Sequence, residues 1–436
     1  MNARQTCEKL LSSVSLPAFV QVENTEACPL VDDPFAKARA EVLACPDLAK
    51  LHTGDTVALT AGSREISNIT FILKGVISAL KSKGAKPFIV PAMGSHGGAT
   101  AEGQTKILEH FGITEQSMGV PIRSCMDTVE IGRTEDGYPV HLDRIATEAD
   151  WILPIGRVKP HTDFRGPAES GVMKMLAIGL GKQFGASLCH KLGFPRMGES
   201  VWKFGQTILQ NTRILMGLAV VENVDHDTAH IEAIPAANIP EREKELLVYA
   251  KELMPRIPVD SIDLLVVSEV GKDISGAGMD PNITGRSCTL GEFWPHAEKI
   301  AVFDLTEVSE GNAAGIGNAD AITRRMANKI DTLPMYINSI TCRDSMGMRI
   351  PVIMETEELA VKYLLYTCIR RDAVPSPRIV WIRNTAHLRK MYVSEALLDE
   401  IRALPNYRIL SEPIVPDVDA EGNLLLWSDE HENPQY

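Results

Sequence analysis

Short apolar runs alternate with amphipathic stretches along most of the chain, and this alternation limits the folds that it can adopt. The runs TVALTA (56–61) and PFIVPAM (87–93) predict strands. Between them, apolar residues such as Ile69, Leu73 and Val76 recur at helical spacing. A helix between two strands is typical of a βαβ unit, so the sequence predicts an α/β fold with largely parallel sheets.

The same alternation continues and then restarts. In the first half, further strands are expected at 151–156 and 213–223, with helices at 100–112 and 238–255. After residue 256 the pattern begins again, with strands expected at 264–271, 299–306 and 378–383 and helices at 319–330 and 356–371. We therefore expect two α/β domains, 1–255 and 256–410. Residues 411–436, rich in Pro, Asp and Glu, form a tail that is expected to run back over the first domain.

Composition excludes several functional classes. A chain of 436 residues is large enough for two hydrophobic cores. Its formal net charge of -13 argues against a protein that binds nucleic-acid backbones, which would carry a basic excess. No apolar run reaches the roughly 18 residues that span a bilayer, and no cleavable signal is evident. The eight cysteines form no CxxC pair, so we expect a cytoplasmic protein with reduced, mostly structural thiols.

Three polar side chains follow three of the expected strands. Arg64 lies after the first strand, His96 lies in a glycine-rich loop after the second, and His161 follows the strand at 151–156. Ligands of open α/β sheets bind beyond the carboxyl ends of the strands, so these side chains are candidates for a site. Each also has a structural interpretation, as a surface ion-pair residue or a hydrogen-bonded histidine.

The run GVMKMLAIGLGKQFGASLCH (171–190) is apolar, yet it carries Lys174 and ends on His190. A lysine stem can lie along apolar surface with its ammonium in water, so neither residue is diagnostic alone. The glycines of GLGKQFG (179–185) match a dinucleotide fingerprint only loosely. The acidic and histidine residues of NVDHDTAHIE (223–232) allow a divalent metal site, although a solvated loop is the simpler interpretation.

The order Arg64, His96, His161, Lys174, His190 resembles the order of functional residues in the nickel-dependent lactate racemase family and its homologous 2-hydroxyacid racemases and epimerases. The resemblance implies two α/β domains with the active site in the cleft between them. It also implies a nickel pincer nucleotide, a pyridinium-3,5-dithio mononucleotide that Lys174 tethers through a thioamide. His190 would be the protein ligand of nickel, a metal that imidazole suits.

The resemblance further implies an isomerase that inverts C2 of a 2-hydroxyacid. The cofactor would accept a hydride while His96 or His161 removes the hydroxyl proton, which gives a 2-keto acid that is reduced on its other face. Arg64 would hold the substrate. The backbone N–H groups of Thr162, Lys182 and the nearby glycines are expected to cradle the cofactor phosphate. Lys272 and Arg286 in the second domain are expected to contact the substrate.

The loop 268–286 and the interval between His161 and Lys174 depart from the lactate enzymes, so an aldonate or a dicarboxylic hydroxyacid is at least as suitable a substrate as lactate. The expected partners are this small molecule and the cofactor-maturation enzymes, with neither nucleic acid nor membrane, and a homo-oligomer is possible.

Three alternatives stay open: a zinc hydrolase whose ligands are His96, His161 and His190, a Schiff-base enzyme using Lys174, and a noncatalytic binding protein of the same fold.

Overall fold

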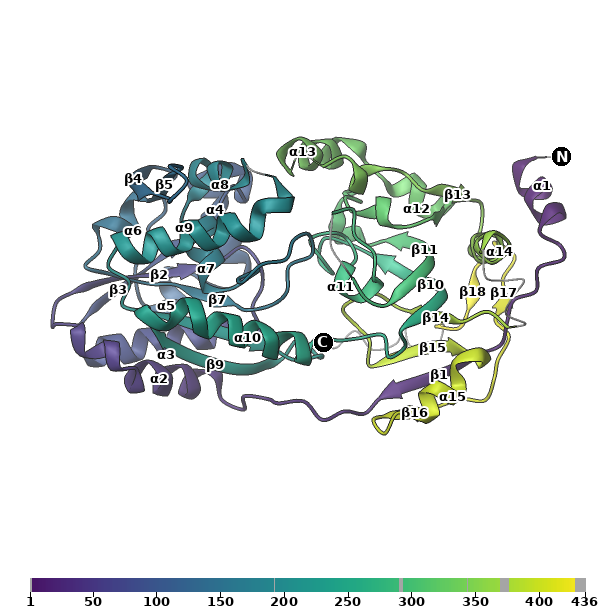
Figure 1. Ribbon diagram of the computed structural model, residues 1–436, viewed down its shortest axis with the longest axis horizontal. Helices are drawn as coiled ribbons and strands as arrows, with labels where there is room; N and C mark the ends of the chain where they lie inside the picture. Colours follow the sequence, from purple (N-terminus) through teal and green to yellow (C-terminus); the bar gives the residue numbers. More distant parts are fainter. Residues whose placement is uncertain (1, 192, 290–292, 343, 369–375, 428–436) are drawn as a thin grey trace. The chain divides into compact units, whose positions relative to one another are not determined.

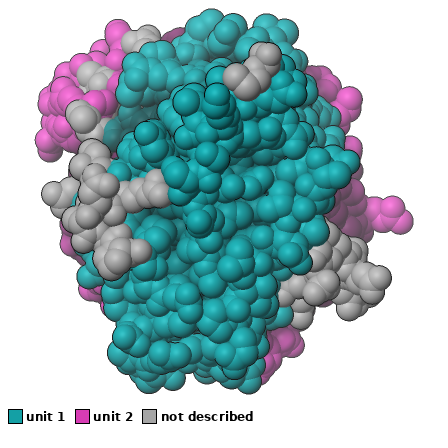
Figure 2. Space-filling view, turned by 90° about the vertical axis from the view of Figure 1, so that its right-hand side faces the viewer, with its two compact units in different colours: residues 1–27, 255–436 teal, residues 28–254 magenta. Residues whose placement is uncertain are grey.

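The computed structural model describes residues 2–191, 193–289, 293–342, 344–368 and 376–427 (Figure 1). The chain divides into two compact units, which Figure 2 distinguishes by colour. Unit 2 comprises residues 28–254, and unit 1 combines residues 1–27 with residues 255–436. Both units contain parallel strands with connecting helices, so the α/β fold expected from the sequence is confirmed.

The main strands of unit 2 form two three-stranded sheets. One has the order β3 (Lys86–Pro91), β2 (Thr56–Ala61) and β6 (Trp151–Leu153), and the other has the order β7 (Ile155–Arg157), β8 (Met216–Glu222) and β9 (Thr228–Pro235). β2 is parallel to β3 and β6, and β7 is parallel to β8, whereas β9 runs antiparallel to β8. The carboxyl ends of β2, β3, β7 and β8 therefore lie at the same edge.

Pro154 divides the expected strand 151–156 into β6 and β7. Proline has no N–H group for the ladder. The Thr60 hydroxyl bridges the gap by accepting a hydrogen bond from the Ile155 N–H at 2.8 Å, and the Pro154 carbonyl still accepts the Leu218 N–H at 2.8 Å. Residues 151–157 thus keep their place between β2 and β8 despite the interruption.

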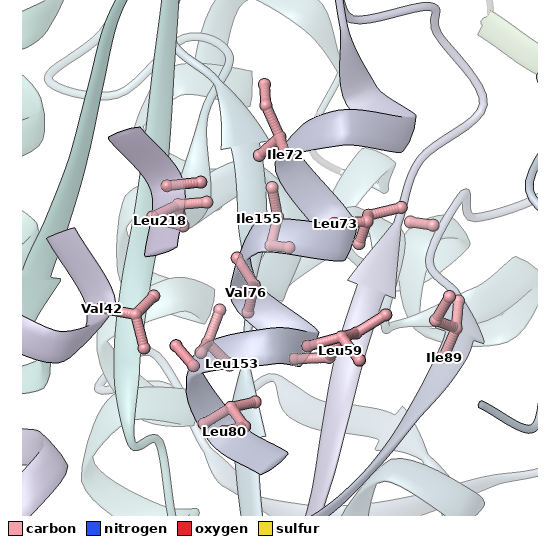
Figure 3. Close-up of a cluster of buried hydrophobic side chains, with 14 of the residues drawn as sticks. Val42, Leu59, Ile72, Leu73, Val76, Leu80, Ile89, Leu153, Ile155 and Leu218 are labelled. Carbon is pink, nitrogen blue, oxygen red and sulfur yellow. The ribbon is translucent and has the colours of Figure 1, made fainter. Parts of the chain in front are cut away.

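Alternate residues of a strand point to opposite faces of a sheet. Both faces carry apolar side chains here, and helices cover both. Leu59 and Leu218 face a cluster formed with α2 (Pro34–Ala44) and α3 (Ile69–Ser82), part of which Figure 3 shows. Their neighbours Ala58 and Ala219 face the second cluster. That cluster includes apolar residues of α7 (Val172–Lys174), α8 (Lys182–His190), α9 (Met197–Asn211) and α10 (Ile239–Leu253).

The apolar run at 171–190 folds as α7, a π-helical turn over Met175–Gly179, and α8. A buried carboxyl group from α10 holds its first turn: Glu243 accepts the Met173 N–H at 3.0 Å and is fully buried. Gly171 is needed here, because its φ is +149° and a Cβ would lie 2.7 Å from the Glu243 carboxyl carbon.

In the sequence, the remaining helices and strands of unit 2 fall between β3 and β6. They are α4 (Ala101–His110), α5 (Glu115–Met118), the antiparallel pair β4 (Thr128–Arg133) and β5 (Pro139–Asp143), and α6 (Arg144–Glu148).

Unit 1 contains one eight-stranded sheet in the order β13-β12-β11-β10-β14-β15-β1-β16. Its strands are β1 (Phe19–Asn24), β10 (Ser261–Val270), β11 (His296–Leu305), β12 (Ala321–Thr323), β13 (Val352–Met354), β14 (Ile379–Ile382), β15 (Lys390–Ser394) and β16 (Tyr407–Ile409). The helices are α1 (Ala3–Leu10), α11 (Pro281–Thr284), α12 (Arg324–Lys329), α13 (Thr332–Cys342), α14 (Glu357–Thr367) and α15 (Leu398–Arg402). The five strands from β13 to β14 are parallel, whereas β15, β1 and β16 pair antiparallel.

The chain ends differ from the division expected from sequence. Residues 1–27 were expected in the first domain, but β1 pairs with β15 and β16 and so completes the sheet of unit 1. The described part of the tail also packs there: Ile414 and Phe19 exchange backbone hydrogen bonds at 2.8 Å, and Leu424 is buried in the unit 1 core. The short hairpin β17 (Asp417–Val418) and β18 (Leu424–Leu425) lies in this tail. Residues 428–436 lie outside the described residues.

Several expected elements need correction. Within the helix expected at 319–330, Ala321–Thr323 form β12, because these buried residues fit between β11 and β13. The glycine-rich stretch before it, 311–320, contains turns as expected. The helix expected at 356–371 ends at Thr367, and residues 369–371 lie outside the described ranges. Within those ranges, no helix combines the length and the apolar character that crossing a bilayer requires.

Burial raises the pKa of Glu243 from its ordinary 4.5 to about 8. Between these two values the folded state holds a proton that the unfolded state has released, so this residue's contribution to stability falls as the pH rises. Relative to wild type, Glu243→Gln should therefore gain about 1–3 kcal/mol in the free energy of unfolding between pH 5 and pH 9. Urea unfolding at several pH values measures this difference.

Glu241→Gln is the matched control, because Glu241 lies on the same helix with its side chain 75% exposed. Its difference from wild type should change little with pH. A Glu243→Gln difference that is equally constant across this range would contradict the assignment of a proton to the buried carboxyl.

Candidate functional site

The structure brings together the five residues that the sequence analysis singled out in unit 2. Arg64 follows β2, His96 follows β3 and His161 follows β7, each at the carboxyl edge of the sheet. Lys174 ends α7, and His190 ends α8.

Electrostatic interactions show that these side chains lie close to one another. The positive charge of Lys174 acts on His96, His161 and His190. Arg64 in turn acts on Lys174 and His96. The loops after three strands and one helical segment therefore form a single cluster. Lys174 has an electrostatic interaction with each of the other four side chains.

Lys174 carries an unusual amine. Burial and the nearby Arg64 lower its pKa from 10.5 to about 8, whereas Asp163 opposes this shift. The Lys174 ammonium lies 5.7 Å from the centre of the Phe164 ring, which stacks on His161 at a centroid distance of 4.1 Å. An amine with a lowered pKa is more often neutral near pH 7 and is then a nucleophile.

The three histidines are all held neutral. Burial, followed by the charges of Arg64 and Lys174, lowers the pKa of His96 to about 4. Burial and Lys174 lower the pKa of His190 to about 4, and the pKa of His161 falls well below 6.5 for the same two main reasons. Near pH 7 these rings are therefore available as bases, hydrogen-bond partners or metal ligands.

Local hydrogen bonds orient two of these rings. The Nδ1 atom of His96 bonds to the Ser63 hydroxyl. The Nδ1 atom of His161 accepts the Asp163 N–H at 3.0 Å, and an Asp163 carboxylate oxygen lies 3.6 Å from it. The buried Glu169 fixes the same loop by accepting the His161 backbone N–H at 2.8 Å. A neutral His161 therefore carries its proton on Nε2, an assignment that follows from its backbone partner.

Positive charge is concentrated around the cluster. Arg157 pairs with Glu222 at the ends of β7 and β8, and its charge together with burial lowers the pKa of Arg64. Lys159 adds further positive charge near Lys174. Because carboxylates are fewer than cations here, the site favours an anionic ligand.

The structure assigns different surroundings to two residues that were expected to bind a cofactor phosphate. Thr162 donates to an Asp163 carboxylate oxygen at 2.6 Å and lies in the His161 loop. Lys182 has no exposed surface, and its ammonium is held by Asp143 at 3.1 Å inside the fold. Lys182 therefore cannot reach a ligand in this conformation, which corrects the expectation that it cradles a phosphate.

The two expected substrate contacts from the second domain lie in unit 1. Lys272 follows β10, and its ammonium donates to the carbonyls of Gly276 at 2.6 Å and Ala314 at 3.2 Å. Arg286 pairs with Asp320 and donates to the Ala297 and Glu298 carbonyls at 2.9 and 2.7 Å, near the amino end of β11. These bonds engage both Arg286 terminal nitrogens inside unit 1, so its expected role in substrate recognition is corrected to a structural one.

Among the described residues, one group of three acidic, thiol or imidazole side chains brings its ligand atoms within 4.8 Å of one another. It consists of Asp263, Glu298 and Cys368 in unit 1, where the thiol lies 3.0 Å from a Glu298 oxygen. The three histidines of the unit 2 cluster do not form such a group among those residues, which argues against a three-histidine zinc site.

The acidic and histidine residues of 223–232 also form no such group within the described ranges. Asn223 organises a turn there by accepting the N–H groups of Asp225 and Asp227 at 2.9 and 3.0 Å, and β9 follows. His230 instead contacts Glu232 at 3.0 Å.

Sequence reasoning missed the residues that support the cluster. Ser63 and Asp163 are adjacent in sequence to Arg64 and Thr162, so their positions in the same loops were a usable signal. Gln104 and Glu243 gave no signal, because a polar residue in an amphipathic helix is normally solvated. Only the tertiary structure places them in the interior.

Comparison with known proteins places the clustered residues within a recognised domain. Residues 31–192, which contain all five, match the family model described as the lactate racemase N-terminal domain. A search of curated proteins found no match.

Two solved structures resemble the chain. One is a crystal structure of a protein from Thermotoga maritima, with 15% identity, a TM-score of 0.43, and coverage of 63% of this chain and 72% of that one. The other is the lactate racemase apoprotein from Thermoanaerobacterium thermosaccharolyticum, with 12% identity, a TM-score of 0.43, and coverage of 85% and 99%. The family-model match covers residues 31–192 and shows that this part of the chain is similar to the lactate racemase N-terminal domain.

Proposed function

We propose that this protein is a racemase or epimerase that inverts C2 of a 2-hydroxyacid with the help of a lysine-tethered nickel pincer nucleotide. The observation that carries the proposal is the cluster itself. An amine with a pKa of about 8 lies among three neutral imidazoles and one arginine, in a part of the chain that is similar to the lactate racemase N-terminal domain.

The donor set fits the cofactor. The lowered pKa of Lys174 suits an amine that must form a covalent thioamide link. His190 offers a neutral imidazole, the form that binds a metal. The surplus of positive charge around Arg157 and Lys159 suits a phosphate-bearing nucleotide. When bound, the cofactor would supply a reversible acceptor for the hydride of the substrate C2.

The protein's own residues would then bind the acid and move its hydroxyl proton. Arg64 would hold the substrate carboxylate or hydroxyl oxygen through charge-assisted hydrogen bonds. His96, bonded at Nδ1 to Ser63, would take the hydroxyl proton at Nε2. His161 presents an Nε2–H group when neutral, so it would first contact the substrate oxygen as a hydrogen-bond donor. Both enantiomers could then be served from opposite sides of a planar 2-keto acid.

The cation surplus favours an anionic substrate and does not discriminate lactate from larger acids. We keep a polar or dicarboxylic hydroxyacid as the substrate class, because the segments flanking His161 and Lys174 carry several polar side chains, among them Asp163, Arg165 and Glu169.

One alternative retains support from the structure. The lowered pKa of Lys174 would equally suit a Schiff base with a carbonyl compound or pyridoxal phosphate. Borohydride treatment separates the two chemistries, because it fixes an imine as a stable mass adduct and a Lys174 thioamide needs no such trapping to persist.

A panel of enantiopure 2-hydroxyacids tests the proposed reaction. The protein, coexpressed with cofactor-maturation enzymes and shown to contain nickel, should racemise or epimerise at least one acid of the panel. In heavy water the product should keep its original C2 hydrogen, because a hydride is transferred and returned internally.

Exchange of C2 hydrogen with solvent would point to proton abstraction in place of hydride transfer. A nickel-loaded protein with no turnover on any acid would favour a noncatalytic binding protein, and stoichiometric zinc with hydrolase activity would overturn the proposal outright.

Substitution of Lys174 tests the tether separately from catalysis. After coexpression with the maturation enzymes, wild-type protein should show the added mass of the cofactor, whereas Lys174→Ala should show none and should lose activity by at least about 1,000-fold. Lys83→Ala, which removes an exposed lysine of the same domain, should retain both. An unchanged mass gain in Lys174→Ala would place the tether at another residue.

A further inference from the structure

A second lysine of the same segment is buried for a different reason. Lys182 begins α8, adopts the left-handed φ of +53° and has no exposed surface. Its ammonium donates to the Pro91 carbonyl, where β3 ends, and to the Gln104 side-chain oxygen at 3.0 Å. The fully buried carboxylate of Asp143 lies 3.1 Å away and balances the charge.

Gln104 connects Lys182 to the loop that carries His96 through hydrogen bonds. Its Nε2 atom donates to the Gly94 carbonyl at 2.8 Å and lies 3.4 Å from the His96 carbonyl. The side-chain oxygen and nitrogen thus have different tasks, since the oxygen receives Lys182 and the nitrogen holds the loop. Gln104 is itself fully buried in α4.

The loop is also pressed against the start of α4. A Cβ at Gly103 would lie 1.9 Å from the Gly97 carbonyl oxygen, so the two backbones touch where His96 is presented. The Ser63 hydroxyl contacts the imidazole from the side of β2. The backbone and the ring of His96 are therefore restrained from separate elements.

Stability alone does not account for this arrangement. A buried ion pair is often no more stabilising than apolar side chains of similar volume, because removing both charges from water is costly. Here the Lys182 ammonium donates to the carbonyl of the last residue of β3, and the Gln104 amide donates to a carbonyl of the turn that follows. These hydrogen bonds therefore fix the position of the loop, and their contribution to core packing is secondary.

We propose that Lys182 and Gln104 are positioning residues that fix the His96 loop relative to the Lys174-bearing segment. Lys182 is suited to this because it stands at the junction between the π-helical turn after Lys174 and the helix that ends at His190. The inference deepens the proposed function, on which the role of His96 as a base depends, but the restraint on the loop can be measured without it.

Two substitutions of Gln104 test this. Gln104→Glu keeps the shape and the oxygen that accepts Lys182, but its carboxylate cannot donate to the loop carbonyls. Gln104→Leu removes both contacts. Gln206→Leu, at a half-buried glutamine of α9, is the matched control. Backbone hydrogen exchange of peptides covering 94–100 and 197–211 is measured in each purified protein, and kcat and KM are measured after cofactor loading.

Both Gln104 variants should exchange at least about tenfold faster at 94–100 and at the wild-type rate at 197–211. Their kcat should fall by about 10- to 100-fold with KM within about twofold of wild type, as expected for a displaced base. The control should match wild type in both. A general loss of folded protein would also lower the apparent kcat at unchanged KM, but it would speed exchange in both peptides, so the exchange at 197–211 separates positioning from unfolding.

Wild-type exchange at 94–100 in Gln104→Glu would overturn the proposal, because it would mean that only the contact to Lys182 matters. Equal acceleration in both peptides would also overturn it. If the loaded wild-type protein turns over no hydroxyacid, the proposed function fails, while the exchange results still decide whether these residues hold the loop.

Discussion

The electrostatics of the site depend on one constraint, the burial of the Lys174 ammonium beside Arg64. Two cations close together in a region of low solvation disfavour any further positive charge. Burial is the largest cause that lowers the pKa of Lys174 to about 8 and keeps the surrounding imidazoles neutral, and the neighbouring positive charges add to it. A nucleophilic amine and three unprotonated rings at neutral pH are thus consequences of the same arrangement.

Keeping such a cluster in place requires restraints from outside it. Glu243 holds the first turn of the segment that carries Lys174, and Lys182 holds the junction where α8 begins. Both residues follow Lys174 in the sequence, and each is fully buried and bonded to backbone groups. Polar interior groups with backbone partners restrict position more strongly than apolar packing does, because their geometry is directional.

The sequence predicted a large part of this structure. The alternation of apolar runs and amphipathic stretches indicated the α/β fold, and the position of Arg64, His96 and His161 after strands indicated a common edge. It could not predict that residues 1–27 complete the sheet of unit 1, because pairing between β1 and β15 joins segments more than 360 residues apart. The burial of Lys182 escaped prediction for a related reason: nothing local shows that a lysine in a glycine-rich stretch is interior, and only the tertiary structure brings it to Asp143.

The account depends most directly on the state of the Lys174 amine, and its titration in the cofactor-free protein is the decisive measurement. The rate at which each lysine is acylated can be followed against pH by peptide mass spectrometry. Half-maximal reactivity of Lys174 is expected near pH 8, well below the value of about 10.4 of a lysine in a model peptide. Half-maximal reactivity of Lys174 at the model-peptide value would contradict a buried amine beside Arg64, and with it the site described for this protein.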